Sequence, residues 1–359
     1  MKNFLYILVF LQTYALSAQT KLKVGVDGLT HDHVGQILSS NKRGDIEIVG
    51  IAEPNKDLAM RYLKRYNLSE SLLFSSLEEM VSKTKPEAVC AFNSIQEHLN
   101  TVKVCAPKGI HVMVEKPLAT NTKDAKIMAD LSVKHNIHLL TNYETTWYPS
   151  HKMAYEIMKN DTEIGTINKM VVRDGHRGPK EIGCSVEFLS WLTDPVKNGG
   201  GAVIDFGCYG ANLMTYFMNG KRPLSVSATL KQIKPEVYPK VDDEATIILT
   251  YPSATAILEA SWNWPFDRKD TEIYTQSSSI FANSKELKIR KGGRDASEKS
   301  QKLEPIPKPE HDSFLYLTAV VKGEINPKNS LSSLENNLLV VEILEKAIQS
   351  AKEGKAVRF

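Results

Sequence analysis

The sequence predicts two domains of different class, an α/β domain followed by an α+β domain with a mainly antiparallel sheet. Up to residue 141, apolar β-branched runs alternate with segments of helical spacing, which predicts a parallel sheet joined by right-handed crossovers. The pattern changes over residues 142–149, and from residue 167 short alternating runs predict antiparallel strands. The length of 359 residues is consistent with two domains, because a chain of that length is too long for a single ordinary hydrophobic core.

The first domain is placed at residues 20–145. Each of its predicted strands is a short apolar run bounded by turn residues, and each predicted helix has apolar residues three and four positions apart. The strands are predicted at 21–26, 46–52, 86–92, 109–115 and 138–141. The helices are predicted from residue 34 and over 56–66, 77–83, 96–108 and 122–135.

The second domain is placed at residues 146–359. Residues 291–309, rich in Lys, Ser and Pro, are predicted to form a long exposed loop. The last helix is expected to pack back on the first domain. The predicted strands are 167–173, 224–231, 245–250, 254–262, 271–274, 279–281 and 287–289, and the predicted helices are 150–159, 311–322 and 331–352.

Residues 1–18 are predicted to be a signal peptide. Lys2 is the only charge before Lys21, residues 4–11 are apolar, and small residues at 15–18 suit cleavage. The alternative is a first strand or short helix, which the domain does not need, because its first strand begins at Lys21. The mature protein is therefore expected to be exported, with the periplasm as its location. No later run reaches the ~20 apolar residues of a membrane span.

Composition excludes several classes of protein. A hydrophobic fraction of 42% and a charged fraction of 24% are ordinary for a globular protein. The net charge of +3 is spread along the chain without a basic stripe, so no nucleic-acid partner is expected. Cys90, Cys105, Cys184 and Cys208 lack metal-type spacing, and buried free thiols are expected for Cys90 and Cys105. No metal site is predicted.

The first strand runs into a glycine turn and then a helix, which is the context that a dinucleotide site requires. Gly25 and Gly28 are present, but Thr30 and His31 stand where the turn would continue toward a third glycine. Glu53 ends the second strand, where a carboxylate accepts hydrogen bonds from a ribose 2′-hydroxyl and repels a 2′-phosphate. Glu53 therefore favours NAD over NADP, although a loop glutamate is the alternative.

Two further motifs carry polar side chains. Glu115 and Lys116 end the strand 109–115 before Pro117, and the carboxyl ends of parallel strands line ligand crevices. The alternative is a solvated ion pair before a turn. Three consecutive glycines at 199–201 precede a segment that contains three polar residues. If this segment is helical, the three side chains lie on one face of the helix and point into the same space. The alternative is an ordinary helix whose polar face meets solvent. The three residues are Asp205, Tyr209 and Asn212.

On these motifs the chain resembles the glucose–fructose oxidoreductase, inositol dehydrogenase and MocA (Gfo/Idh/MocA) family over essentially its mature length. The resemblance rests on residues 24–28, 93–98, 115–117 and the glycine stretch leading to Asp205 and Tyr209. It implies an N-terminal Rossmann domain that binds NAD(P), covered by a C-terminal α+β domain with an open, mainly antiparallel sheet. It also implies a homo-oligomer, a dimer or tetramer.

The resemblance implies roles for individual residues. Lys116 would touch substrate and nicotinamide, and Asp205 and Tyr209 would be the catalytic pair; many members have histidine in place of Tyr209. Asn212 stands where the family has an acid, and residues 30–33 depart from the family's phosphate-binding turn. The further cofactor contacts would be Asn93, His98 and Glu115, with a helix cap as the alternative for His98.

The implied reaction is hydride transfer between a carbinol carbon of a sugar-like substrate and the nicotinamide. Tyrosine, with a pKa near ~10, is a poor base unless a cation stabilises its phenolate, and Lys116 is the candidate cation. Asp205 would orient the polyol or tune Lys116. Replacing Lys116 by alanine is expected to depress turnover and leave the fold intact. Substrate contacts are expected from Trp147, Tyr148, His176, Arg177 and Trp191, with Asn212.

Three functions remain open from the sequence. The first is an exported NAD-dependent oxidoreductase acting on a sugar, glycoside or polyol, with 3-keto sugars as one product class. The second is a glycosidase that retains NAD and uses transient oxidation and elimination. The third is a non-catalytic sugar-binding protein. Because no free nicotinamide pool is evident outside the inner membrane, export predicts a tightly retained cofactor, yet residues 1–18 lack the twin arginines of a folded-protein export signal.

Overall fold

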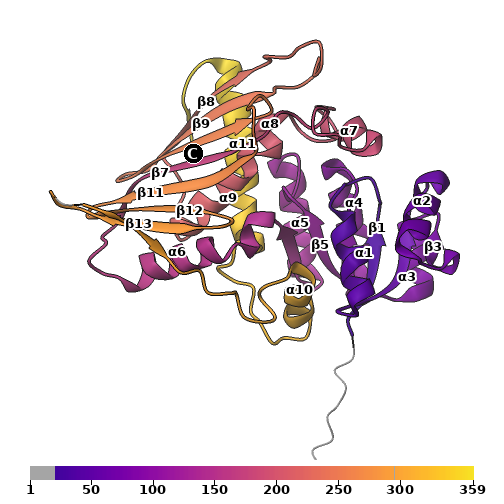
Figure 1. Cartoon of the computed structure of the whole chain (residues 1–359). Coiled ribbons are helices and arrows are strands. Elements are labelled where there is room, and N and C mark those ends of the chain that lie inside the picture. Colours follow the sequence, from indigo (N-terminus) through magenta and orange to yellow (C-terminus); the bar gives the residue numbers. More distant parts are fainter. Residues whose placement is uncertain (1–20, 295) are drawn as a thin grey trace, which may run out of the picture.

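The computed structural model describes residues 21–294 and 296–359, and it contains two sheets that lie side by side (Figure 1). The predicted signal peptide lies outside the described residues. Within the described chain, no helix is both long and apolar enough to cross a membrane. Cys90 and Cys105 are buried free thiols, as predicted, and Cys184 and Cys208 are also free.

The first domain is a six-stranded parallel sheet in the order β3-β2-β1-β4-β5-β6. The direction of the strand order reverses between β1 and β4, which opens a ligand crevice outside their carboxyl ends. All five predicted strands are present; the two-residue β3 was not expected, because so short a segment carries no pattern. The bounds are β1 Lys23–Asp27, α1 Val34–Arg43, β2 Glu47–Ala52, α2 Lys56–Tyr66, β3 Leu73–Phe74, α3 Leu77–Thr84, β4 Ala88–Ala91, α4 His98–Cys105, β5 His111–Glu115, α5 Thr122–Lys134 and β6 Leu139–Asn142.

The second domain is a nine-stranded sheet in the order β14-β13-β12-β11-β7-β10-β9-β8-β15. All neighbours are antiparallel except β7 and β10, so the predicted fold class is confirmed. The bounds are α6 Pro149–Asn160, β7 Ile167–Gly175, α7 Val186–Leu192, α8 Ala202–Asp205, α9 Gly207–Phe217, β8 Ser225–Lys231, β9 Glu244–Thr250, β10 Thr255–Ser261, β11 Arg268–Thr275, β12 Ser278–Asn283, β13 Leu287–Lys291, β14 Glu298–Gln301, α10 Ser313–Val321, α11 Leu334–Glu353 and β15 Val357–Arg358.

Two predictions about this domain are wrong. The segment 291–309 is not all loop, because β14 pairs with β13 through its backbone even though its sequence, Glu-Lys-Ser-Gln, is polar. An edge strand needs only main-chain partners on one side, so it shows no apolar pattern. The stretch from Asp205 to Phe217 is not one helix, because it breaks at Phe206 between α8 and α9. The helix α7 was not expected.

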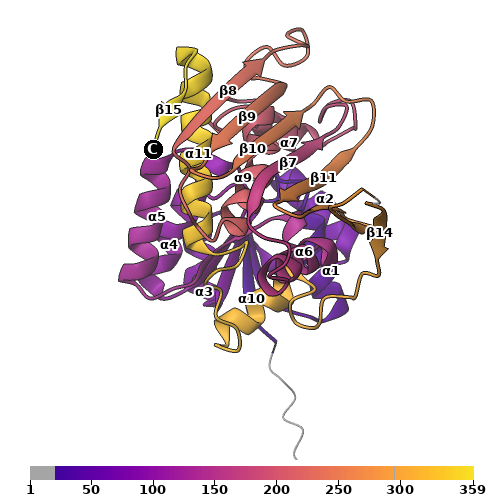
Figure 2. The same cartoon turned by 90° about the vertical axis from the view of Figure 1, so that its left-hand side faces the viewer.

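Two helices lie between the sheets. α9 packs on β7 and β10, and α11 packs on β8, while α11 also contacts α5 and β6 of the first domain (Figures 1 and 2). Near the end of the chain, α10 places Phe314, Leu317 and Val320 in the core around β1 and α1. The opposite face of the nine-stranded sheet is not covered by helices (Figure 1), and exposed Ile248 and Tyr274 lie on its strands.

The glycine stretch 199–201 allows a close backbone approach. A Cβ atom at Gly201 would lie 1.8 Å from the carbonyl oxygen of Asp242. The side-chain carboxylate of Asp242 also accepts hydrogen bonds from the N–H groups of Gly201 and Val203, at 2.8 and 2.7 Å. Only glycine leaves room for this contact, which fixes the start of α8 and hence the position of Asp205 at its end.

Candidate active site

Lys116 and Asp205 form a buried ion pair between the two domains. Lys116 follows β5, and its Nζ donates to Asp205 Oδ1 at 2.5 Å and to the Asp205 carbonyl at 2.9 Å. The other carboxylate oxygen accepts the Trp262 indole N–H at 2.9 Å. The side chains are only 5% and 7% exposed, so the structure joins the two sequence motifs that were expected to carry the chemistry.

This environment keeps both members of the pair charged. Burial alone would lower the pKa of Lys116, but the Asp205 carboxylate raises it above its usual value. Burial would raise the pKa of Asp205, but Lys116 lowers it below its usual value. Because the structure buries Lys116 in an ion pair, we now expect its removal to lower the stability of the fold, since the loss of one partner leaves an uncompensated buried charge.

Tyr209 lies beside two ammonium groups. The centre of its buried ring is 5.1 Å from Lys116 Nζ and 4.4 Å from Lys269 Nζ. Burial raises the pKa of Tyr209 well above its usual value, and the carboxyl groups of Asp174 and Glu144 raise it further. The phenol is therefore neutral at physiological pH, so its hydroxyl is available as a hydrogen-bond donor.

Lys269 belongs to a second polar cluster that sequence reasoning missed. Its Nζ pairs with Glu144 Oε2 at 2.5 Å, and the Tyr148 hydroxyl donates to the other oxygen of Glu144. Asp174, at the end of β7, is 2% exposed, and its Oδ1 has no hydrogen-bond partner among the described residues. In a segment as charged as Asp267–Asp270, nothing in the sequence distinguishes Lys269.

The second cluster lines a cavity of about 460 Å³ next to the Lys116–Asp205 pair. Tyr148 and His176, two of the predicted substrate residues, lie on its wall. The His176 ring packs edge-on against Phe206 at 4.8 Å between centroids, and its Nδ1 accepts the N–H of Gly178. Burial lowers the pKa of His176, so the ring is neutral and presents an Nε2–H donor.

The crevice at the switch between β1 and β4 fits a dinucleotide. Gly28 has φ +80°, and a Cβ atom there would lie 2.8 Å from that of Asn93. Two buried polar atoms of the described chain have no partner there, Asn93 Oδ1 and His98 Nε2. Glu53 is buried at the end of β2, where its carboxylate accepts the N–H groups of Leu29 and Asn55. These groups provide the carboxylate and the unpartnered polar atoms that a bound nucleotide requires.

His31 connects the first turn with the Glu115–Lys116 motif. Its Nδ1 accepts the N–H of His33, its Nε2 lies 4.0 Å from Glu115 Oε2, and His33 Nδ1 lies 3.0 Å from the same oxygen. The three side chains are close enough to hold a metal ion. However, a neutral His31 whose Nδ1 accepts a hydrogen bond has its proton on Nε2, so that nitrogen has no free lone pair for a metal. The arrangement is that of a hydrogen-bonded cluster.

The remaining predicted site residues are placed as follows. Trp191 packs against His31 and is buried, and Trp147 donates its indole N–H to Asn142, which in turn donates to Glu115. Arg177 is exposed. Thr30 is half-buried, and its hydroxyl lies 3.5 Å from the carbonyl oxygen of Phe92.

Two predicted residues serve packing between elements. Gly25 lies within β1 against the Met80 side chain, where a Cβ atom would come within 2.6 Å of the Met80 methyl carbon. Asn212 is fully buried and donates to the Leu331 carbonyl oxygen and to Asn337 of α11. The structure therefore does not bring Asn212 to the crevice, because its side chain is directed to the segment before α11 and to Asn337.

The sequence matches known family models in both domains. Residues 22–143 match the model of an oxidoreductase family with an NAD-binding Rossmann fold, and residues 154–281 match the GFO/IDH/MocA C-terminal domain. The chain belongs to the Gfo/Idh/MocA family of oxidoreductases. Its first domain is therefore an NAD-binding Rossmann domain.

Several individual proteins are similar. Trans-1,2-dihydrobenzene-1,2-diol dehydrogenase from Xenopus tropicalis is 25% identical over 214 residues, which is 60% of each chain, and the Bos taurus protein is 24% identical over 226 residues. The match thus spans less than two thirds of these relatives. Aldose-aldose oxidoreductase from Caulobacter crescentus, complexed with glycerol, has a TM-score of 0.79 at 18% identity, covering 94% of this chain and 100% of that one. Levoglucosan dehydrogenase, complexed with NADH and levoglucosan, has a TM-score of 0.78 at 20% identity, covering 94% and 99%.

Proposed function

We propose that this protein is an exported NAD-dependent oxidoreductase that acts on a CH–OH group of a sugar, glycoside or polyol. The observation that carries the proposal is the placement of Lys116, Asp205 and Tyr209 together at the carboxyl end of β5, beside the Rossmann crevice. The names of the similar proteins, among them an aldose-aldose oxidoreductase and a levoglucosan dehydrogenase, support a carbohydrate substrate. A 3-keto sugar is one product class, and a homo-oligomer is the expected assembly.

The protein supplies binding, orientation and proton transfer. When bound, NAD accepts or returns the hydride. Lys116, held charged by Asp205, donates a hydrogen bond to the reacting oxygen, and Tyr209 is the proton donor to that oxygen when a carbonyl is reduced. In the oxidation direction one of the same groups must first be deprotonated so that it can accept the hydroxyl proton, and the raised pKa values of both groups make that form scarce at neutral pH. The free protein is thus better prepared for reduction.

The raised pKa values of Tyr209 and Lys116 predict how the reaction rate depends on pH. Deprotonated Tyr209 or Lys116 accepts the hydroxyl proton, and because both pKa values are raised, that form is scarce at neutral pH and increases as pH rises. We expect the initial rate of alcohol oxidation to rise by up to about tenfold per pH unit from about pH 7 to about pH 9, while carbonyl reduction stays nearly constant. Initial rates in both directions measure this. An oxidation profile with a maximum near neutrality would contradict the assignment.

The function itself is tested on the purified mature protein. Denaturation should release stoichiometric NAD or NADH, identified by absorbance and mass spectrometry, and added sugars should change the redox state of the bound cofactor. The same mass spectrum gives the N-terminus, and the absence of residues 1–18 would support export. Release of an aglycone without net NADH would instead identify the glycoside-cleaving alternative. A protein that neither contains nor binds NAD or NADP would leave sugar binding without catalysis as the better description.

A further inference from the structure

We propose that the cavity between Asp174 and Asn283 binds a second sugar unit, so that the preferred substrate is a neutral disaccharide or larger glycoside. The inference rests on the proposed function, because it assigns the substrate class of the same site. It depends on three features of the cavity, which are an unpartnered buried carboxyl group, its extent across the sheet and its balance of charge.

The unpartnered group is Asp174. Its side chain is 2% exposed and lines the cavity, and its Oδ1 accepts no hydrogen bond from any described residue. A buried polar atom without a partner costs free energy, so such an atom facing a cavity indicates a ligand that supplies the missing hydrogen bond. Burial raises the pKa of Asp174 well above its usual value, and a protonated carboxyl both donates and accepts, as a sugar hydroxyl requires.

The cavity extends away from the reacting groups. Its inner end is at Asp174 and Phe206, next to the Lys116–Asp205 pair, and its outer end is at Asn283 and Lys285 in the β12–β13 turn. In the sheet, β7 pairs with β11 and β11 with β12, so the cavity crosses two strand spacings, roughly 10 Å. That length exceeds the width of one pyranose ring. A ring held beside Lys116 would leave the outer part free for a second unit.

The charges on the cavity wall favour a neutral ligand. Lys269 is paired with Glu144, and Arg268 is paired with Asp270. Because Asp174 is protonated, the remaining lining charges are Asp267 and Lys285, which balance each other. A phosphorylated sugar or a uronic acid would need an excess of cations, which this wall does not offer.

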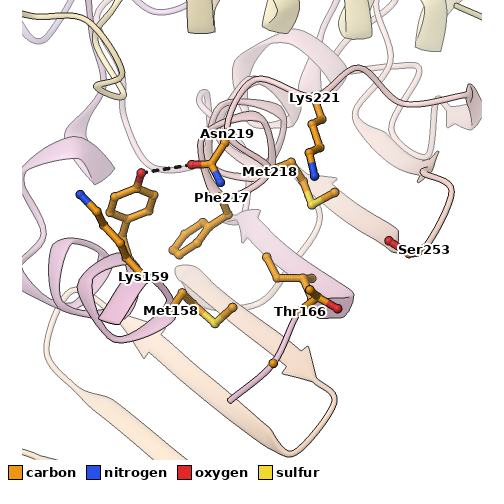
Figure 3. A pocket seen from close by; sticks show the side chains of 11 residues that line it. Met158, Lys159, Thr166, Phe217, Met218, Asn219, Lys221 and Ser253 are labelled. Atoms are coloured by element: carbon orange, nitrogen blue, oxygen red, sulfur yellow. Dashed lines mark hydrogen bonds between the residues drawn. The ribbon is translucent and has the colours of Figure 1, made fainter. Parts of the chain in front are cut away.

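A second cavity of similar volume, about 460 Å³, does not have these properties (Figure 3). It is lined by Ile167 at the start of β7, whereas Asp174 is near the end of that strand. Its lining contains no carboxylate, and the Asn219 side chain already accepts a hydrogen bond from Tyr155. The combination of an unpartnered acid and proximity to the reacting groups therefore distinguishes the Asp174 cavity.

The test compares glycosides with their parent sugars. Initial rates with NAD would be measured for glucose and galactose against cellobiose and lactose, and saturation-transfer NMR would measure binding of the same sugars without turnover. We expect the unsubstituted protein to have the higher kcat/KM for a disaccharide. Asp174→Leu, which keeps a similar volume but offers neither a donor nor an acceptor, should reduce the ratio of disaccharide to monosaccharide kcat/KM by about 10- to 100-fold, as expected for the loss of a hydrogen bond to a strongly polar group.

A second variant acts at the outer end. Ser284 is exposed in the β12–β13 turn and lines the cavity, so Ser284→Trp should obstruct the second unit without disturbing the core, and should reduce the same ratio. Lys169→Met, at an exposed position near the start of β7, is the matched control and should leave the ratio unchanged.

The outcomes separate this inference from the proposed function. Oxidation of monosaccharides with no preference for disaccharides would overturn the second subsite and keep the function. Equal losses for both sugar classes in Asp174→Leu and no effect of Ser284→Trp would also overturn it, because Asp174 would then act on the chemistry. If no sugar is turned over, tighter binding of cellobiose than of glucose, abolished by Ser284→Trp, supports the subsite, and equal binding overturns it.

Discussion

Replacing Lys116 by methionine is expected to lower kcat by about 10³-fold and the free energy of unfolding by about 3 kcal/mol. The catalytic loss follows because a positioned donor at the reacting oxygen is removed from a site that excludes water. The stability loss follows because the buried Asp205 carboxyl loses its cation and, among the described residues, is left with the Trp262 indole as its side-chain donor. Steady-state kinetics and urea unfolding measure the two effects.

The control is the double variant Lys116→Met with Asp205→Asn. Removing the buried negative charge as well should restore most of the lost stability, while turnover stays low because the ammonium group is still absent. If Lys116→Met alone is as stable as the unsubstituted protein, the Lys116–Asp205 pair is not buried in solution as described. A double variant that regains turnover would remove Lys116 from the proposed chemistry.

Gly201→Ala is expected to reduce the free energy of unfolding by about 3 kcal/mol, since overpacking against rigid backbone cannot be relieved by a rotamer change. The added Cβ atom would lie 1.8 Å from the Asp242 carbonyl oxygen, so the start of α8 must move. Because Asp205 ends that helix, the movement should also lower turnover. Urea unfolding followed by tryptophan fluorescence measures the first effect.

Gly207→Ala is the matched control. Gly207 is the first residue of α9, and a Cβ atom there would meet only the ends of the flexible Ile247 and Leu344 side chains, at 3.2 and 3.5 Å. We expect its effect on stability to stay within about 1 kcal/mol. If the two alanine variants are equally stable, the close approach to Asp242 is not a constraint on the fold.

The fold could be predicted from the sequence where local pattern decides it. The strands β1, β2, β4, β5 and β6 are apolar runs with clear turn residues at their ends, and the helices between them have regular spacing. The edge strand β14 and the break at Phe206 could not be predicted in this way. β14 depends on a partner strand, and the break falls at a phenylalanine, which carries no helix-ending signal in the sequence.

For the candidate site, residues inside distinctive motifs were easier to find than isolated ones. Lys116 and Asp205 stand out because a proline and three glycines mark their neighbourhoods. Asp174 and Lys269 lie ninety-five positions apart within ordinary strands, and only the pairing of β7 with β11 places them opposite each other. Asn212 looked like a site residue because a continuous helix was assumed, yet its amide binds the α11 region.

The Lys116–Asp205 pair joins a residue at the carboxyl end of β5 in the six-stranded sheet to one from the helix layer of the nine-stranded sheet. Neither half of the chain holds all the proposed reacting groups by itself, so on the proposed function the contact between the halves is needed to form the site. Side chains that hold the two halves together, including those of α11 that contact α5 and β6, therefore contribute to the proposed site indirectly. Substitutions there would appear in an activity screen as loss of function, although their direct effect is on assembly of the site.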